Sequence, residues 1–144
     1  MRHGIDTDFL VAVEITDHPF HSPADALLQR LLDDGHDFAL APQTLAEFIH
    51  VVTDPRRMPQ PLSTVDAVAR AEHWWQSAEA VHVFPDSQSV AHFVDWLRHH
   101  RIGRKRLLDT LLAATFRTAG VPAIVTNNVH DFALLGGFRI VEYR

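Results

Sequence analysis

The chain has 144 residues, of which 47% are hydrophobic and 22% are charged, and it contains no cysteine. A chain of this length can bury a large core without a metal or disulfide, so we expect a single domain over residues 1–144. The lack of cysteine excludes disulfides, cysteine-ligated zinc and thiol catalysis. No apolar run approaches the roughly 20 residues that span a bilayer, and the N-terminus has no hydrophobic signal segment. We therefore expect a cytoplasmic protein that does not contact membranes.

The formal net charge of −5 results from 18 acidic and 13 basic residues. A negative balance is unusual for a protein that binds nucleic acid. The charges are unevenly distributed, however, because five of the 13 bases lie within residues 98–106 and several acids lie among apolar residues. The positions of the charges are therefore more informative than their sum.

Apolar segments of strand length alternate with longer amphipathic segments along the chain. In chain order the pattern predicts a strand at 2–6, a helix at 7–15, a proline-containing loop at 17–23, a helix at 23–34, a strand at 38–41, a helix at 42–53, an exposed loop at 54–61, a helix at 64–80, a strand at 81–84, a helix at 86–100, a basic loop, a helix at 107–119, a strand at 121–126, a helical turn at 131–135 and a strand at 138–141. Such alternation predicts a three-layer α/β fold with a mostly parallel central sheet and helices on both faces. The functional crevice of such sheets lies at the carboxyl ends of the strands.

Three acids lie where ordinary surface acids are not expected. Asp6 lies at the carboxyl end of the first strand, Glu47 is the only charged residue of the helix at 42–53, and Asp109 lies on the apolar face of the helix at 107–119. A carboxylate in apolar surroundings is costly unless it is paired or bound to a cation. Oxygen ligands without cysteine favour Mg²⁺, or Mn²⁺ in its place, over zinc. A converging set of this kind predicts phosphoryl transfer or phosphodiester hydrolysis.

Each acid also has a simpler explanation. Asp6 could cap the helix that follows it, and Glu47 could pair with an arginine across the core. Asp109 could interact with the dipole of its own helix, and Asp131 could cap the short helical turn. The presence of acids on several elements, in this order, favours a shared site over these separate explanations.

Four segments together resemble the PIN-domain ribonucleases, and within them the VapC toxins of VapBC toxin–antitoxin pairs. They are Gly4–Leu10, Leu45–Phe48, Leu108–Ala114 and Val125–Phe132. The resemblance covers essentially the whole chain. It implies a PIN-like nuclease domain that cleaves RNA internally with Mg²⁺, forms a homodimer and is neutralised by a small VapB-type antitoxin.

The resemblance also implies roles for individual residues. Asp6, Glu47 and Asp109 correspond to the acids of the metal site. The family's fourth acidic position falls at Asn128 or is served by Asp131, which would make Asp131 a further metal ligand. An amide at this position adds no charge, and Asp8, where the family often has Asn or Ser, could supply the missing negative charge.

Hydroxyl and basic side chains are candidates for contacts with the substrate. Thr7 and Thr126 could orient a ligand, although each could equally cap a turn. A basic segment precedes the helix that carries Asp109 and could bind the phosphate backbone; its members are Arg101, Arg104, Lys105 and Arg106. The alternative is a solvated helix end whose cations interact with the dipole of the preceding helix. Arg56 and Arg57, in the proline-rich loop, are further candidates.

Two other functions fit part of the pattern. Asp6 and Asp8 after a strand resemble the start of haloacid-dehalogenase-like phosphatases, which also need a lysine in the crevice, and Lys105 is the only lysine. A PIN-like domain that no longer cleaves and serves as an interaction module is favoured by Asn128. The three acids oppose that second alternative.

The histidines and the tryptophan pair are not expected to form a site. None of the 11 histidines has a spacing typical of metal ligands, so we expect them to be scattered and solvated. Trp74 and Trp75 could stack on bases, but a position in the core or at a dimer contact is the favoured interpretation.

Overall fold

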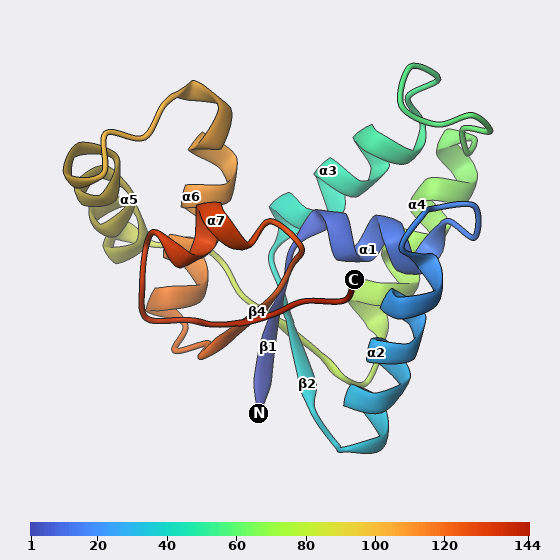
Figure 1. The fold of residues 1–144 in the computed structure, drawn as a ribbon, viewed down its shortest axis with the longest axis horizontal. Helices are drawn as coiled ribbons and strands as arrows, with labels where there is room; N and C mark the ends of the chain where they lie inside the picture. Colours follow the sequence, from blue (N-terminus) through green and yellow to red (C-terminus); the bar gives the residue numbers. More distant parts are fainter.

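The computed structural model describes all 144 residues and contains a five-stranded sheet between two layers of helices (Figure 1). The strands are β1 (Arg2–Ile5), β2 (Asp37–Leu40), β3 (Ala80–His82), β4 (Ala123–Val125) and β5 (Arg139–Val141). The helices are α1 (Thr7–Glu14), α2 (His21–Asp33), α3 (Pro42–Val52), α4 (Thr64–Gln76), α5 (Ser87–His99), α6 (Leu107–Thr118) and α7 (Val129–Ala133), with a 3-10 turn, η1 (Arg104–Arg106), before α6. None of these helices combines the length and hydrophobicity needed to cross a bilayer.

The sheet is parallel at every pairing, and its strand order is β3-β2-β1-β4-β5. The chain builds outward from β1 to β3 and then crosses back to place β4 on the other side of β1. The direction of winding therefore reverses between β1 and β4, and the carboxyl ends of these two strands flank the position where such folds form a cleft. The predicted class, a parallel α/β sheet with helices on both faces, is confirmed.

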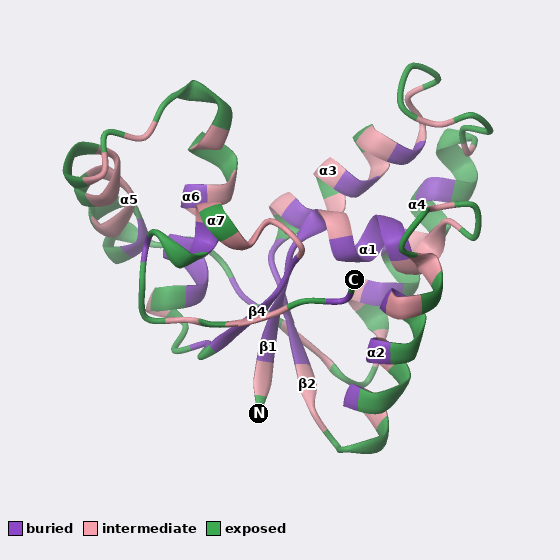
Figure 2. Ribbon diagram, viewed as in Figure 1, coloured by how far each residue is buried: buried purple, intermediate pink, exposed green.

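Alternate residues of the strands belong to two separate apolar clusters, and much of the sheet is coloured as buried in Figure 2. On β2, Phe38 and Leu40 belong to the core under α1 to α4, whereas Ala39 belongs to the core under α6 and α7. On β4, Val125 belongs to the first of these cores and Ile124 belongs to the second. The two-residue period of the strands thus separates two apolar clusters, one on each face of the sheet.

Gly4 on β1 allows α6 to pack directly against the middle of the sheet. A Cβ atom at this position would lie 2.6 Å from the ring of Phe116, which is fully buried on α6. Only a residue without a side chain is compatible with this approach. The contact brings α6, and with it Asp109, close to the end of β1.

Several boundaries differ from the sequence prediction, by up to four residues. Helix α2 begins at His21 because Pro23 lies in the first turn, where no amide is needed for an intrahelical bond. Helix α4 ends at Gln76 because Ser77 is extended, and the carbonyl of Glu79 accepts a hydrogen bond from β2. The expected basic loop contains the 3-10 turn η1.

Candidate active site

Asp6 lies at the carboxyl end of β1 and is 5% exposed. One carboxylate oxygen accepts a hydrogen bond from the backbone N–H of Thr7 at 2.8 Å, which makes Asp6 the N-cap of α1. The other oxygen accepts from the hydroxyl of Thr126, at the end of β4, at 2.7 Å. Helix capping and membership of a site are therefore compatible for Asp6.

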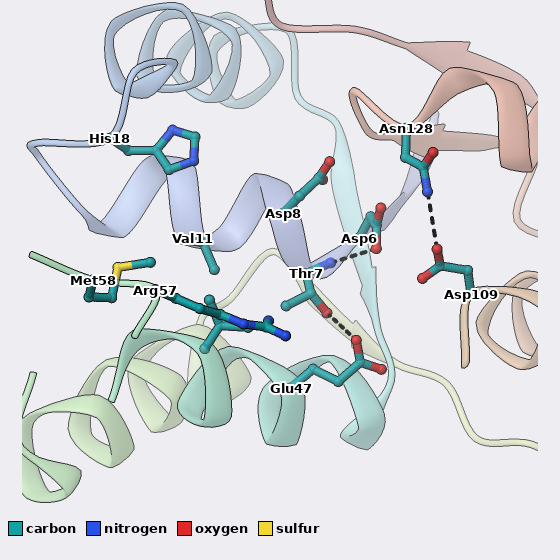
Figure 3. Close-up of a pocket in the computed structure, with 11 residues that line it drawn as sticks. Asp6, Thr7, Asp8, Val11, His18, Glu47, Arg57, Met58, Asp109 and Asn128 are labelled. Atoms are coloured by element: carbon teal, nitrogen blue, oxygen red, sulfur yellow. Dashed lines mark hydrogen bonds between the residues drawn. The ribbon is translucent and has the colours of Figure 1, made fainter. Parts of the chain in front are cut away.

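A cavity of about 360 Å³ opens at this end of the sheet (Figure 3). Its walls come from α1, α3, the loops that follow each of these helices, α6 and the loop after β4. The lining residues are Asp6, Thr7, Asp8, Val11, His18, Glu47, Val51, Arg57, Met58, Asp109 and Asn128. The structure thus brings the three predicted acids together, with Asp8 as a fourth carboxylate.

Glu47 reaches the cavity from α3 and is held by two hydrogen bonds. It accepts from the hydroxyl of Thr7 at 3.2 Å and from the side-chain amide of Gln43 at 2.8 Å. The same amide of Gln43 donates to the carbonyl of Leu108 at 2.7 Å, which links α3 to the start of α6. Gln43 was not predicted as a site residue, although its i,i+4 spacing from Glu47 on a helix is a recognisable signal.

The loop after β4 determines the surroundings of Asp109. The side-chain amide of Asn128 donates to Asp109 at 3.1 Å and to Asp131 at 3.0 Å. Asp131 also forms an ion pair with Arg106 at 3.2 Å. Asn128 lines the cavity and Asp131 does not, so the carboxylate of Asp131 lies behind the amide and beside an arginine.

Asp8 is held in place by the C-terminal segment. Asp8 accepts hydrogen bonds from the backbone N–H of Asn127 at 3.3 Å and from the hydroxyl of Thr126 at 3.4 Å, and the side chain of Tyr143 lies beside it. Tyr143 is buried, packs against Phe9 with ring centroids 5.1 Å apart, and donates its own backbone N–H to the side chain of Asn127. No motif in the sequence indicated that Tyr143 contributes to the site.

Burial and mutual repulsion disfavour the charged forms of the clustered acids. Burial, followed by the charges of Asp8 and Asp109, raises the pKa of Asp6 well above its usual range. Burial, followed by the charge of Glu47, raises the pKa of Asp109 to about 6. A cation in the cavity would favour the ionised form of both groups.

The chemistry of the donor set fits a divalent cation. All the candidate ligands are carboxylates, which suit Mg²⁺ and Mn²⁺. The acids face a common cavity, but no three His, Asp or Glu side chains lie close enough together to coordinate one ion. Asp6, Glu47 and Asp109 are the residues that could hold such an ion.

The basic segment lies at the edge of the site and does not line the acidic cavity. Arg106 contacts Asp131, whereas Arg101, Arg104 and Lys105 are exposed. Residues 103–106 line a separate depression of about 330 Å³. Because the only lysine is outside the acidic cavity, the site lacks the lysine that the phosphatase alternative requires.

The structure places His18 differently from the sequence expectation, whereas it agrees with the expectation that the tryptophan pair forms no site. His18, expected to be a solvated residue, lines the cavity, and burial lowers its pKa. Trp74 is 8% exposed in the core and donates its indole N–H to Glu14 at 2.6 Å. Trp75 lies outside the site and stacks on His82 with ring centroids 3.6 Å apart.

Comparison with known proteins agrees with the geometry. The chain matches the PIN domain over residues 5–136. It is 28% identical to Ribonuclease VapC24 of Mycobacterium tuberculosis, over 95% of this chain and 93% of that protein. Its fold is similar to that of VapBC2 from Rickettsia felis, solved bound to a promoter DNA fragment, with a TM-score of 0.71, 16% identity and full coverage of both chains. It is also similar to VapC20 of M. tuberculosis, a toxin that cleaves the sarcin–ricin loop, with a TM-score of 0.69, 16% identity, and 92% and 94% coverage. The chain belongs to the PIN domain family.

Proposed function

We propose that this protein is a metal-dependent endoribonuclease and the toxin of a VapBC-type toxin–antitoxin pair. The observation that carries the proposal is the convergence of Asp6, Glu47 and Asp109, from three elements far apart in the sequence, on one cavity at the winding reversal of the sheet. The similarity to a protein named ribonuclease VapC24 supports RNA as the substrate.

In this proposal Asp6, Glu47 and Asp109 hold Mg²⁺, for which Mn²⁺ can substitute. A divalent cation in such a site activates water for attack on a phosphodiester and neutralises charge on the scissile phosphate. The hydroxyls of Thr126 and Thr7 donate to Asp6 and Glu47, and so keep these carboxylates turned toward the cavity. No side-chain nucleophile is required.

The fourth position of the site is shared between an amide and a carboxylate. Asn128 faces the cavity and orients Asp109, whereas Asp131 contributes its charge from behind, where Arg106 partly offsets it. We assign the remaining cations of the basic segment, Arg101, Arg104 and Lys105, to the phosphate backbone outside the cavity. Their exposure leaves them free for this contact.

The similarity to VapBC complexes supports a VapB-type antitoxin as the partner of this chain. By the same comparison we propose that the toxin is a homodimer. Its place of action is the cytoplasm, where the substrate RNA is found.

Cleavage of total bacterial RNA in Mg²⁺, with the new 5′ ends mapped, tests the proposed activity. The wild type and Asp95→Asn, a matched change of an exposed acid on α5, should cleave. Asp6→Asn, Asp109→Asn and addition of EDTA should each abolish cleavage while circular dichroism shows a folded protein. Cleavage by a folded Asp109→Asn variant would exclude the proposed site. A wild type that is stabilised by Mg²⁺ but cleaves nothing would favour the interaction module.

A further inference from the structure

The loop between α3 and α4 is tied to the body of the protein on both sides of its two arginines. The carbonyl of Asp54 accepts hydrogen bonds from the backbone N–H groups of Arg57 and Met58, at 3.1 and 3.0 Å. Met58 and Leu62 pack against the core, and the N–H of Leu62 donates to the end of α3. The backbone of Arg57 is therefore held at a defined place on the rim of the acidic cavity.

The two arginines of this loop point in different directions. Arg57 lines the cavity, and its guanidinium extends toward the side where Thr7 and Glu47 lie (Figure 3). The side chain of Arg56 is 86% exposed, pairs with Asp54 at 3.3 Å and does not line the cavity. Sequence alone made the two residues equivalent candidates, and the structure distinguishes them.

Arg57 is the only arginine or lysine among the residues that line the cavity, which include four carboxylates. Its guanidinium nevertheless forms no ion pair with any of these four acids, and its one ionic contact is with Asp54 at 3.8 Å. Its side chain donates no hydrogen bond within the protein. An arginine whose role was to neutralise the acids would pair with them, whereas this one keeps its donors free for a group that enters the cavity.

We propose that Arg57 binds a phosphate of the RNA backbone as it enters the acidic cavity. The planar guanidinium matches two non-bridging phosphate oxygens and forms charge-assisted hydrogen bonds with them. Arg57 holds the backbone against the α3 side of the cavity, opposite Asn128. The inference rests on the proposed function and adds a substrate-binding residue that lies apart from the basic segment at 101–106.

The test compares the wild type, Arg57→Ala, Arg57→Lys and the matched control Arg56→Ala. The probe is a fluorescein-labelled RNA oligonucleotide of mixed sequence, whose binding is followed by anisotropy in Ca²⁺, a cation that oxygen ligands also hold. Arg57→Ala should weaken binding about tenfold, the effect of losing a hydrogen bond to a charged group. The slope of log K against log salt should decrease by about 0.7. Arg57→Lys should recover part of the loss, and Arg56→Ala should bind like the wild type.

A second measurement separates substrate binding from damage to the metal site. The increase in melting temperature produced by Mg²⁺ alone should be as large in Arg57→Ala as in the wild type, because Arg57 is not a ligand of the metal. Loss of that shift together with RNA binding would overturn the proposal. Equal RNA affinities of the Arg57→Ala and Arg56→Ala variants would also overturn it.

The cleavage assay distinguishes this inference from the proposed function. A wild type that cleaves RNA, with binding that does not depend on Arg57, contradicts the inference alone. A wild type that binds RNA through Arg57 but does not cleave it supports the inference and contradicts the nuclease function.

Discussion

The side-chain amide of Asn128 connects two acids, donating to Asp109 at 3.1 Å and to Asp131 at 3.0 Å. The loop after β4 and helix α6 are thereby joined at the cavity. An amide in this place stabilises the acid cluster without adding to its negative charge. The protein therefore tolerates the cluster without a cation better than it would with a further acid at this position.

Asn128→Asp should alter stability in opposite directions with and without metal. In EDTA the new carboxylate loses two hydrogen bonds and repels its neighbours, so the free energy of unfolding should fall by about 1–3 kcal/mol. In Mg²⁺ the added charge should increase the stabilisation by the metal. Thermal melting in both conditions measures this, with Asn128→Ala as the control that removes the bonds without adding charge. A loss of stability in EDTA that is no larger for Asn128→Asp than for Asn128→Ala would show that charge at this position has no effect.

The stability of the metal-free protein should depend on pH through Asp109. Its pKa is raised to about 6, so the folded state binds more protons than the unfolded state between its ordinary pKa and 6. Stability is therefore lost as the pH rises through this range, and above it the ionised carboxylate of Asp109 costs about 3 kcal/mol. Asp6, whose pKa is also raised, contributes in the same direction.

Melting temperatures in EDTA between about pH 3.5 and 7 measure this dependence. The difference between the wild type and Asp109→Asn isolates the contribution of Asp109 from the other titrating groups. Saturating Mg²⁺ should remove most of that difference, because the cation favours the ionised carboxylate. Parallel pH profiles of the two proteins in EDTA would contradict the assignment.

Tyr143→Phe should loosen Asp8 while preserving the core. The change keeps the ring packed against Phe9 and removes the hydroxyl dipole that lies beside the partly buried carboxylate of Asp8. We expect a loss of about 1–2 kcal/mol in chemical denaturation. A double-mutant cycle with Asp8→Asn provides the control, and additive effects of the two changes would show that the residues do not interact.

Charge reversal in the basic segment tests its contact with RNA. The double variant Arg104→Glu and Lys105→Glu should bind labelled RNA more weakly and with a flatter dependence on salt, because fewer counterions are released. Arg30→Glu, a reversal of one charge at an exposed position on α2, is the control for charge reversal away from the segment. If both variants show the salt dependence of the wild type, the basic segment has only the role of a solvated helix end.

The sequence predicted most of the elements because their signals are local. The prolines and glycines near helix ends marked boundaries to within a few residues, and the largest error was at the end of α4. There, Ser77 is extended and Glu79 bonds to β2, a contact between segments about 40 residues apart that no local pattern encodes.

The residues of the site also divide into those with a local sequence signal and those that only tertiary contacts reveal. Asp6, Glu47 and Asp109 were recognisable because each is a charge on an otherwise apolar face. Tyr143 carried no such signal, because a single tyrosine near the C-terminus is an ordinary core residue until it is placed beside Asp8.

Composition and periodicity therefore determined the α/β class and singled out the acids that line the cavity, since burial on a helix or strand repeats with a fixed short period. Tertiary structure alone decided the strand order, the position of Asn128 in front of Asp131 and the choice of Arg57 over Arg56 at the cavity. These features depend on which segments pack together across the sheet. Contacts of that kind are selected by the free energy of the whole core, which no stretch of neighbouring residues contains.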